Sequence, residues 1–148
     1  MAAALPAADL RAGFLAVHNT ERRAVGVAPL RWSADLEADA RRWADQLARA
    51  RRLQHAPRSG QGENLWMGFG FADPLQAVRA FAQEKRVFRN LPMPRISSTG
   101  RWQDAGHYSQ MVWARTTAVG CASSRNSSHV VVVCRYTPPG NVMGQRAF

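Results

Sequence analysis

The chain has 148 residues, a mass of 16.4 kDa and a formal net charge of +10. This length suits one ordinary domain, and we expect a single domain over residues 1–148. The 46% hydrophobic share excludes a disordered chain, and no apolar run is long enough for a transmembrane helix. The positive charge favours anionic surfaces as partners. Because the arginines are spread along the chain and are not interleaved with aromatic residues, nucleic acid binding is not expected.

Two amphipathic helices are predicted in the first third of the chain. Asp9 can cap the first helix, whose apolar residues recur at helical spacing until a turn at residues 26–29. Ser33 can cap the second helix, which combines an apolar stripe with a basic, solvent-facing side. The apolar stripes are Leu10, Phe14 and Val17 in the first helix, and Leu36, Ala40, Trp43 and Leu47 in the second.

A glycine-rich loop is predicted over residues 55–70, followed by a third helix. Asp73 and Pro74 form a typical helix start, because Asp can cap the helix and Pro suits its first position. The stripe of this helix is Leu75, Val78, Phe81 and Phe88. Residues 92–100 are rich in Pro, Ser and Gly and indicate irregular chain.

The pattern then becomes that of strands. A strand is predicted over Tyr108–Trp113. In a strand, Ser109, Met111 and Trp113 would lie on one face and Tyr108, Gln110 and Val112 on the other. The run His129–Tyr136 is apolar without alternation at its centre, which is typical of a strand covered on both faces, between two layers of helices. The polar residues 123–128 indicate a hairpin. If its turn centres between residues 127 and 128, Cys121 lies opposite Cys134, and either a disulfide or two free buried thiols is compatible with that arrangement.

Glu84 is the most informative single candidate for chemistry. On a helix it lies beside the apolar stripe, where a carboxylate needs a partner or a metal, although an edge position near Lys85 is the alternative. His55, Glu63 and His107 could complete a divalent-metal set, but they are far apart in sequence, and each His can equally be structural.

Three further residues are open to a structural or a chemical role. His18 is either a surface residue or part of a buried network, and His129 is expected to be structural. Ser109 lies close to His107, but no GxSxG elbow surrounds it, so serine hydrolysis is not expected.

A series of short motifs runs along most of the chain. They are HNxxR at 18–22, PLxW at 29–32, WAxxL at 43–47, GENL at 62–65, GHYSQMVW at 106–113, VGCA at 119–122 and VCRYxPPGN at 133–141. Together with His55 they resemble the CAP superfamily, or SCP domain family, over residues 9–146. That superfamily comprises cysteine-rich secretory proteins, insect venom antigens and plant pathogenesis-related proteins.

The resemblance implies an α/β fold, a three-layer α-β-α sandwich with a small antiparallel sheet between helices. It implies a disulfide between Cys121 and Cys134, and a cleft in which two imidazoles would hold a divalent metal such as Zn²⁺. The cleft residues are His55, Glu63, Glu84 and His107, of which His55 and His107 are the metal ligands. The family more often has Trp at the position of Phe81, three residues before Glu84.

The resemblance also implies a secreted or periplasmic protein of a compact, bacterial kind. Residues 1–10 lack the pattern of a signal peptide, so a signal would already have been removed. We expect a non-enzymatic binding module for a small lipid, sterol-like or surface ligand. The alternatives are a metal-assisted, peptidase-like hydrolase with Glu63 or Glu84 as general base, and a scaffold with a vestigial cleft.

Overall fold

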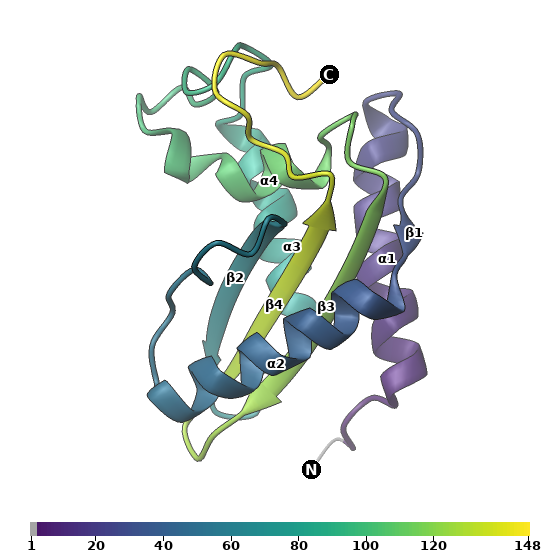
Figure 1. The fold of residues 1–148 in the computed structure, drawn as a ribbon, viewed down its shortest axis with the longest axis vertical. Coiled ribbons are helices and arrows are strands. Elements are labelled where there is room, and N and C mark those ends of the chain that lie inside the picture. Colours follow the sequence, from purple (N-terminus) through teal and green to yellow (C-terminus); the bar gives the residue numbers. More distant parts are fainter. Residues whose placement is uncertain (1–2) are drawn as a thin grey trace.

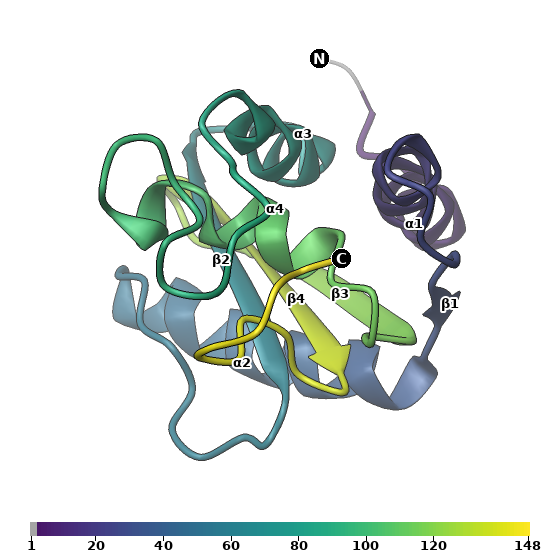
Figure 2. The same ribbon diagram turned by 90° about the horizontal axis from the view of Figure 1, so that it is seen from above.

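A four-stranded sheet lies between two layers of helices in the computed structural model, which describes residues 3–148 (Figure 1). Helix α2 covers one face of the sheet, while α1, α3 and α4 lie on the other side (Figure 2). The predicted α-β-α sandwich is therefore confirmed. The helices are α1 (Ala7–Ala24), α2 (Ala34–Ala50), α3 (Leu75–Gln83) and α4 (Gly106–Met111), with 3-10 turns η1 (Glu84–Arg86) and η2 (Trp102–Asp104). The strands are β1 (Arg31–Trp32), β2 (Gly62–Phe69), β3 (Ala118–Arg125) and β4 (His129–Thr137). Within the part of the chain that the structure describes, no helix combines the length and apolar character needed to cross a membrane.

The order of the strands is β1-β3-β4-β2, and only the short β1–β3 pair is parallel. Strand β4 is central, because it pairs antiparallel with both β2 and β3. The register places Cys121 opposite Cys134 as predicted, and the two buried cysteines form a disulfide. The same strand brings Arg135 opposite Glu63 on β2.

Two hydrophobic cores explain the apolar run in β4. Val130 and Val132 pack into the larger core, which lies against α1, α3 and α4, whereas Val131 and Val133 pack into the smaller core against α2. A strand with helices on both faces needs apolar residues at every position, so the prediction from that run is confirmed.

The strand predicted over Tyr108–Trp113 is wrong, because residues 106–111 form helix α4. All six of the residues from 108 to 113 are buried, so the apparent alternation of two faces carried no information about strand geometry. The first turn of α4 is stabilised by a side chain from another part of the chain, described below.

The prediction of a loop over residues 55–70 is also wrong in its second half, which forms strand β2. The two glycines inside the strand lie close against other side chains. A Cβ at Gly62 would lie 2.1 Å from Gln110 Oε1, and a Cβ at Gly68 would lie 2.2 Å from the Trp66 ring. These glycines mark close approaches within a strand, although glycine runs usually indicate loops.

The predicted helix starts differ little from the observed ones. The Ser33 hydroxyl accepts a hydrogen bond from Leu36 N (3.2 Å), and Asp73 Oδ1 accepts one from Leu75 N (2.9 Å). Helix α1 begins at Ala7, so Asp9 lies in its first turn and does not cap it. Helix α3 ends at Gln83, before Phe88, which packs on the larger core beyond η1.

The HNxxR motif fixes α1 to the rest of the larger core. Asn19 exchanges hydrogen bonds with both the N–H and the C=O of Leu30. The buried Arg22 guanidinium donates to four backbone carbonyl oxygens, those of Ala28, Met111, Trp113 and Thr116. These residues therefore act as structural clamps, since each one satisfies backbone groups that connect separate segments.

Candidate functional site

The first histidine–carboxylate pair joins the end of α3 to the start of α4. Glu84 Oε1 accepts hydrogen bonds from the backbone N–H groups of His107 (2.9 Å) and Tyr108 (3.1 Å). Glu84 Oε2 lies 2.6 Å from His107 Nδ1. The carboxylate thus satisfies free N–H groups of α4 and orients the imidazole at the same time. The imidazole also stacks on Phe81, with 4.6 Å between ring centroids, so Phe supports this ring where the family more often has Trp.

A buried polar network lies behind this pair. Asn64 Nδ2 donates to the His107 carbonyl oxygen (3.0 Å) and to the Tyr136 hydroxyl (3.2 Å). The same hydroxyl lies 2.7 Å from His18 Nε2, and His18 Nδ1 lies 2.7 Å from the Phe14 carbonyl oxygen. Because a carbonyl only accepts, His18 carries its proton on Nδ1 and accepts from Tyr136 at Nε2.

Burial keeps both ends of this network uncharged. Desolvation lowers the pKa of His18 to about 4, and it raises the pKa of the Tyr136 hydroxyl above its ordinary range. His18 is therefore a member of a buried network, one of the two roles that the sequence left open.

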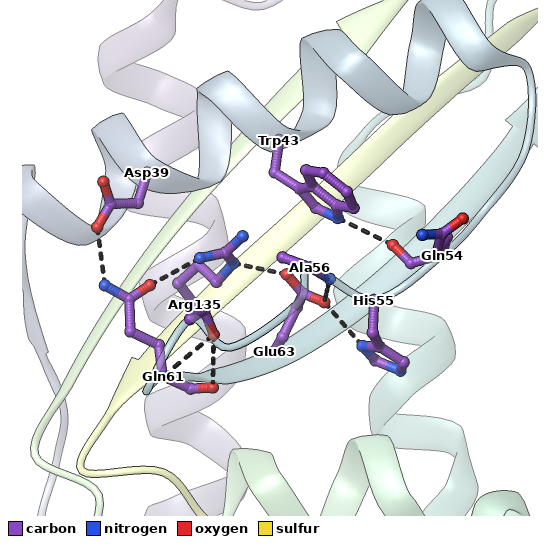
Figure 3. A network of polar contacts seen from close by, with 9 residues as sticks. Asp39, Trp43, Gln54, His55, Ala56, Gln61, Glu63 and Arg135 are labelled. Atoms are coloured by element: carbon purple, nitrogen blue, oxygen red, sulfur yellow. Dashed lines mark hydrogen bonds and ion pairs between the residues drawn. The ribbon is translucent and has the colours of Figure 1, made fainter.

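The second pair lies where the chain enters β2 (Figure 3). Glu63 Oε1 lies 2.7 Å from His55 Nδ1 and accepts a hydrogen bond from Ala56 N (3.0 Å). Glu63 Oε2 forms an ion pair with Arg135 Nε at 2.6 Å, and both side chains are only 6% exposed. The His55 side chain, in contrast, is 69% exposed. The carboxylate is thus buried and held by a cation, while its imidazole extends into solvent.

The Arg135 guanidinium extends this network toward α2, as Figure 3 shows. Arg135 Nη1 donates to Gln61 Oε1 (2.9 Å), and Gln61 Nε2 donates to Asp39 Oδ2 (2.7 Å). The Trp43 indole N–H donates to the Gln54 carbonyl oxygen (2.9 Å) and thereby fixes the segment before His55. Between α2 and residues 56–61 there is a pocket of about 360 Å³ that Arg135 helps to line.

The two pairs lie on either side of the first residues of strand β2. Glu63 and Asn64 are neighbours in sequence and point to opposite faces of the sheet. Asn64 bonds to the backbone of His107, so both pairs lie at the end of the sheet where β2 begins. The structure therefore joins His55 to Glu63 and Glu84 to His107 as two separate hydrogen-bonded pairs.

The carboxylate also changes the acidity of His55. Its hydrogen bond to Glu63 raises the pKa of His55 above the ordinary value, against the opposing effects of partial burial and of Arg135. The imidazolium form is thus favoured more than in an isolated histidine.

The comparison with known protein families decides which family this is. Residues 15–136 match the profile of CAP, the Cysteine-rich secretory protein family. The chain belongs to the CAP family.

Relatives support this assignment over nearly the whole chain. This CAP protein is 39% identical to pathogenesis-related protein 1B of Nicotiana tabacum over 138 residues, which cover 91% of this chain and 79% of the relative. It is 35% identical over 139 residues to pathogenesis-related protein PRMS of Zea mays, with coverage of 91% and 80%. Among solved structures, NaASP2 crystallised with Zn²⁺ superposes with a TM-score of 0.78 at 28% identity, covering 93% of this chain and 84% of that one.

His55 and His107 of this CAP protein have the donor chemistry of zinc ligands. His55 and His107 each bond to a carboxylate through Nδ1, and within residues 3–148 neither Nε2 makes a hydrogen bond. Carboxylate-bound imidazoles with a free nitrogen are typical zinc donors. No three of the four cleft residues, all within the described range, bring ligand atoms within 4.8 Å of one another. At most two of these four residues could therefore share one ion.

One other cluster has the composition of a metal site but not its chemistry. In the described part of the chain, His18, Cys121 and Cys134 have potential ligand atoms within 4.8 Å of one another. Both sulfur atoms are joined in the disulfide, so no thiolate is available to bind an ion.

A groove lies between α1 and the end of α3, and Gln83 and Lys85, the sequence neighbours of Glu84, are in its lining. Its volume is about 370 Å³. Ala16, Val17 and Ala82 supply apolar lining, and Lys85 pairs with Glu21 in it at 3.1 Å. Lys85 is therefore occupied by Glu21 and is not the partner of Glu84, which resolves the alternative raised for that carboxylate.

The sequence-based candidate list misses three residues that support the site, namely Asn64, Arg135 and Tyr136. A usable signal for Arg135 is that it is a charged residue at the end of an otherwise apolar buried strand, where it needs an anion. Ser109 is fully buried on α4, and its hydroxyl finds no hydrogen-bond partner among residues 3–148. Its hydroxyl is therefore not exposed to solvent.

Proposed function

We propose that this CAP protein is a non-enzymatic binding module that works outside the cell, in the surroundings or in a periplasm. The proposal rests on the number of hydrogen bonds and ion pairs that the two carboxylates already form. The oxygens of Glu84 accept three hydrogen bonds, and those of Glu63 accept two and form an ion pair with Arg135. Three of the roughly four lone-pair sites of each carboxylate are thus already used, so both are better suited to orienting the imidazoles than to activating a water as general base.

The ligand we propose is a small lipid or sterol-like molecule in the groove between α1 and α3. The groove volume of about 370 Å³ lies within the range of ligand pockets, and its apolar lining suits a hydrocarbon. Arg79 and Lys85 line the same groove and already pair with Asp73 (3.6 Å) and Glu21 (3.1 Å), so an acidic head group would have to displace one of these carboxylates. A divalent ion bound by His55 and His107 would then have a structural or regulatory role.

A direct binding experiment tests the lipid proposal. The probes are cis-parinaric acid and dehydroergosterol, whose fluorescence rises on transfer to an apolar site. Ala16→Trp should fill the groove and lower the affinity for the preferred probe by at least about tenfold, because the bulk of Trp occupies the ligand volume. Ala24→Trp is the control, since Ala24 is an exposed residue of α1 that does not line the groove. Equal affinity in the two variants would contradict the proposed location.

A separate titration tests the metal. Calorimetry with Zn²⁺ should show saturable binding to the protein and none to the His55→Ala/His107→Ala variant. Heat that is unchanged in the variant would reject the two-histidine site. If Zn²⁺ binds and the loaded protein cleaves casein, with loss of cleavage in Glu63→Gln or Glu84→Gln, then the hydrolase alternative replaces the binding proposal. If neither probe binds and no cleavage occurs, the scaffold alternative replaces it.

A further inference from the structure

Two phenylalanines at the end of β2 are almost completely exposed. Phe69 is 83% and Phe71 is 86% exposed, more than every other large hydrophobic side chain in residues 3–148. They flank Gly70, whose φ of +62° permits the tight turn that separates the two rings. Apolar side chains of this size are usually buried, so a pair of them at one projecting turn marks a surface for interaction.

The turn that carries these rings is held in place from several sides. Gly70 N donates to the Ser128 carbonyl oxygen (2.7 Å), and Arg125 donates to the carbonyl oxygens of Gly70 (3.4 Å) and Ala72 (3.3 Å). Phe69 also lies 5.0 Å from the His129 ring. The exposure of the two rings is therefore a feature of a fixed turn.

Cations surround this turn. Arg125 bonds directly to its backbone, and Arg51 bonds to the Ser127 and Ser128 hydroxyls of the adjacent hairpin. Arg49 and Arg52 lie exposed at the same end of α2, which approaches the hairpin at the lower end of the sheet in Figure 1. In sequence, residues 105–148 contain no Asp or Glu, and residues 46–72 contain only Glu63, which lies at the opposite end of β2. The acidic residue nearest the turn in sequence is Asp73, which pairs with Arg79 at 3.6 Å.

We infer that this end of the molecule binds the surface of an anionic lipid bilayer. The two Phe rings would enter the interfacial region, and the four guanidinium groups would pair with lipid phosphates. This surface lies at the other end of the sheet from the two histidine pairs, and the inference does not depend on the ligand proposed for the α1–α3 groove.

Charge complementarity favours a bilayer over a second copy of this chain. A copy of the same surface would bring four arginines against four arginines, which repel one another. An anionic bilayer offers negative charge at its surface and apolar chains beneath it, and this matches projecting aromatic rings with a cationic surround.

The test is co-sedimentation of the full chain with phosphatidylcholine vesicles, with or without about 30% phosphatidylglycerol. We expect binding only to the anionic vesicles, and weaker binding as salt is raised. Phe69→Ser/Phe71→Ser should lower the partition coefficient by at least about tenfold, because the apolar contribution is lost. Met143→Ser/Phe148→Ser is the matched control, since these two side chains are 60% and 40% exposed elsewhere, and it should bind as the unmodified protein does.

The charge contribution has its own matched pair of variants. Arg49→Gln/Arg52→Gln should lower binding by about twenty-five-fold, at about fivefold for each arginine near the surface. Arg101→Gln/Arg115→Gln removes two exposed arginines elsewhere and gives the same net charge, so it should have a much smaller effect. If Phe69→Ser/Phe71→Ser fails to fold by circular dichroism, Phe71→Ser alone replaces it, because Phe71 lies outside the strand.

Three outcomes would overturn the inference. One is equal binding by the Phe variant and its control. Another is equal binding to neutral and anionic vesicles. The third is a dimer in sedimentation velocity that Phe71→Ser dissociates while vesicles are not bound, which would assign the surface to a second copy.

Discussion

The two histidine–glutamate pairs of this CAP protein are alike in composition and differ in how they are held. Glu84 is fixed by two backbone N–H groups of α4, and its partner His107 stacks on Phe81. Glu63 is fixed by the side chain of Arg135, and its partner His55 extends from a loop into solvent. The first pair is thus part of a helix terminus, and the second is part of a buried ion pair.

This difference shows that the same His–Glu arrangement can depend on two kinds of interaction. Helix α4 cannot lose Glu84 without exposing its own N-terminal groups, so the geometry of that pair is tied to the fold. The other pair depends on the balance of two charges taken out of water, where removal of one charge is costly and removal of both is often tolerated. The two pairs should therefore respond differently to mutation, pH and metal.

The largest effect is expected from breaking the buried ion pair. Glu63→Ala leaves the Arg135 guanidinium, whose side chain is 6% exposed, without its anion. We expect the free energy of unfolding to fall by about 3–5 kcal/mol in urea denaturation. The double variant Glu63→Leu/Arg135→Met removes both charges and should recover most of that loss. A loss below about 1 kcal/mol in the single variant would mean that Arg135 regains water by moving outward.

The next effect is a pH dependence from the network behind His107. The folded-state pKa of His18 is about 4 and its ordinary value is 6.5, so the unfolded chain binds more protons between these two values. Stability should therefore be unaffected above about pH 6.5 and should fall as pH drops toward 4, by about 3 kcal/mol in total. His18→Gln should lose this part of the slope in denaturation curves taken across that range. If the slope of stability against pH is the same in His18→Gln, other titrating groups cause it.

The two carboxylates should contribute differently to Zn²⁺ affinity, and this difference should be smaller than the two effects on stability. In Glu84→Gln, the stacking on Phe81 still orients His107, so we expect Zn²⁺ affinity to fall only about tenfold. In Glu63→Gln, nothing comparable orients the exposed His55, so we expect a fall of about a hundredfold. Calorimetric titration of both variants checks the order. The reverse order would mean that the loop holds His55 without help from its carboxylate.

The smallest effect concerns the charge of His55 itself. Its pKa is raised, so any stability from the His55–Glu63 contact is present at low pH and is lost as pH rises through the folded-state value. Because the side chain is 69% exposed, solvent screens most of that contribution. An NMR titration should find the His55 pKa above its ordinary value and should find it lowered in Glu63→Gln. A pKa that is the same in both proteins would remove Glu63 as the cause.

The sequence predicts the parts of this structure that depend on local pattern. The apolar run of β4, the caps at Ser33 and Asp73 and the opposition of Cys121 and Cys134 all follow from residues near one another in sequence or from a simple hairpin register. The four cleft residues are identified by the resemblance to the family, and the structure joins them in two pairs.

The missed features depend on contacts between distant segments. Helix α4 is stabilised at its start by Glu84, which lies 23 residues before His107, so no local cap marks it. Strand β2 contains Gly62 because Gln110 occupies the space of a Cβ there. The role of Arg135 becomes visible only when the register places it opposite Glu63.

The position of β4 at the centre of the sheet has a consequence for the folding of this protein. Both cores need its side chains, so neither layer of helices can pack fully before residues 129–137 have joined the sheet. Arg22 likewise lacks three of its carbonyl partners until residues 111–116 are in place. The two layers are thus coupled through one strand, and we expect them to form together in a cooperative step.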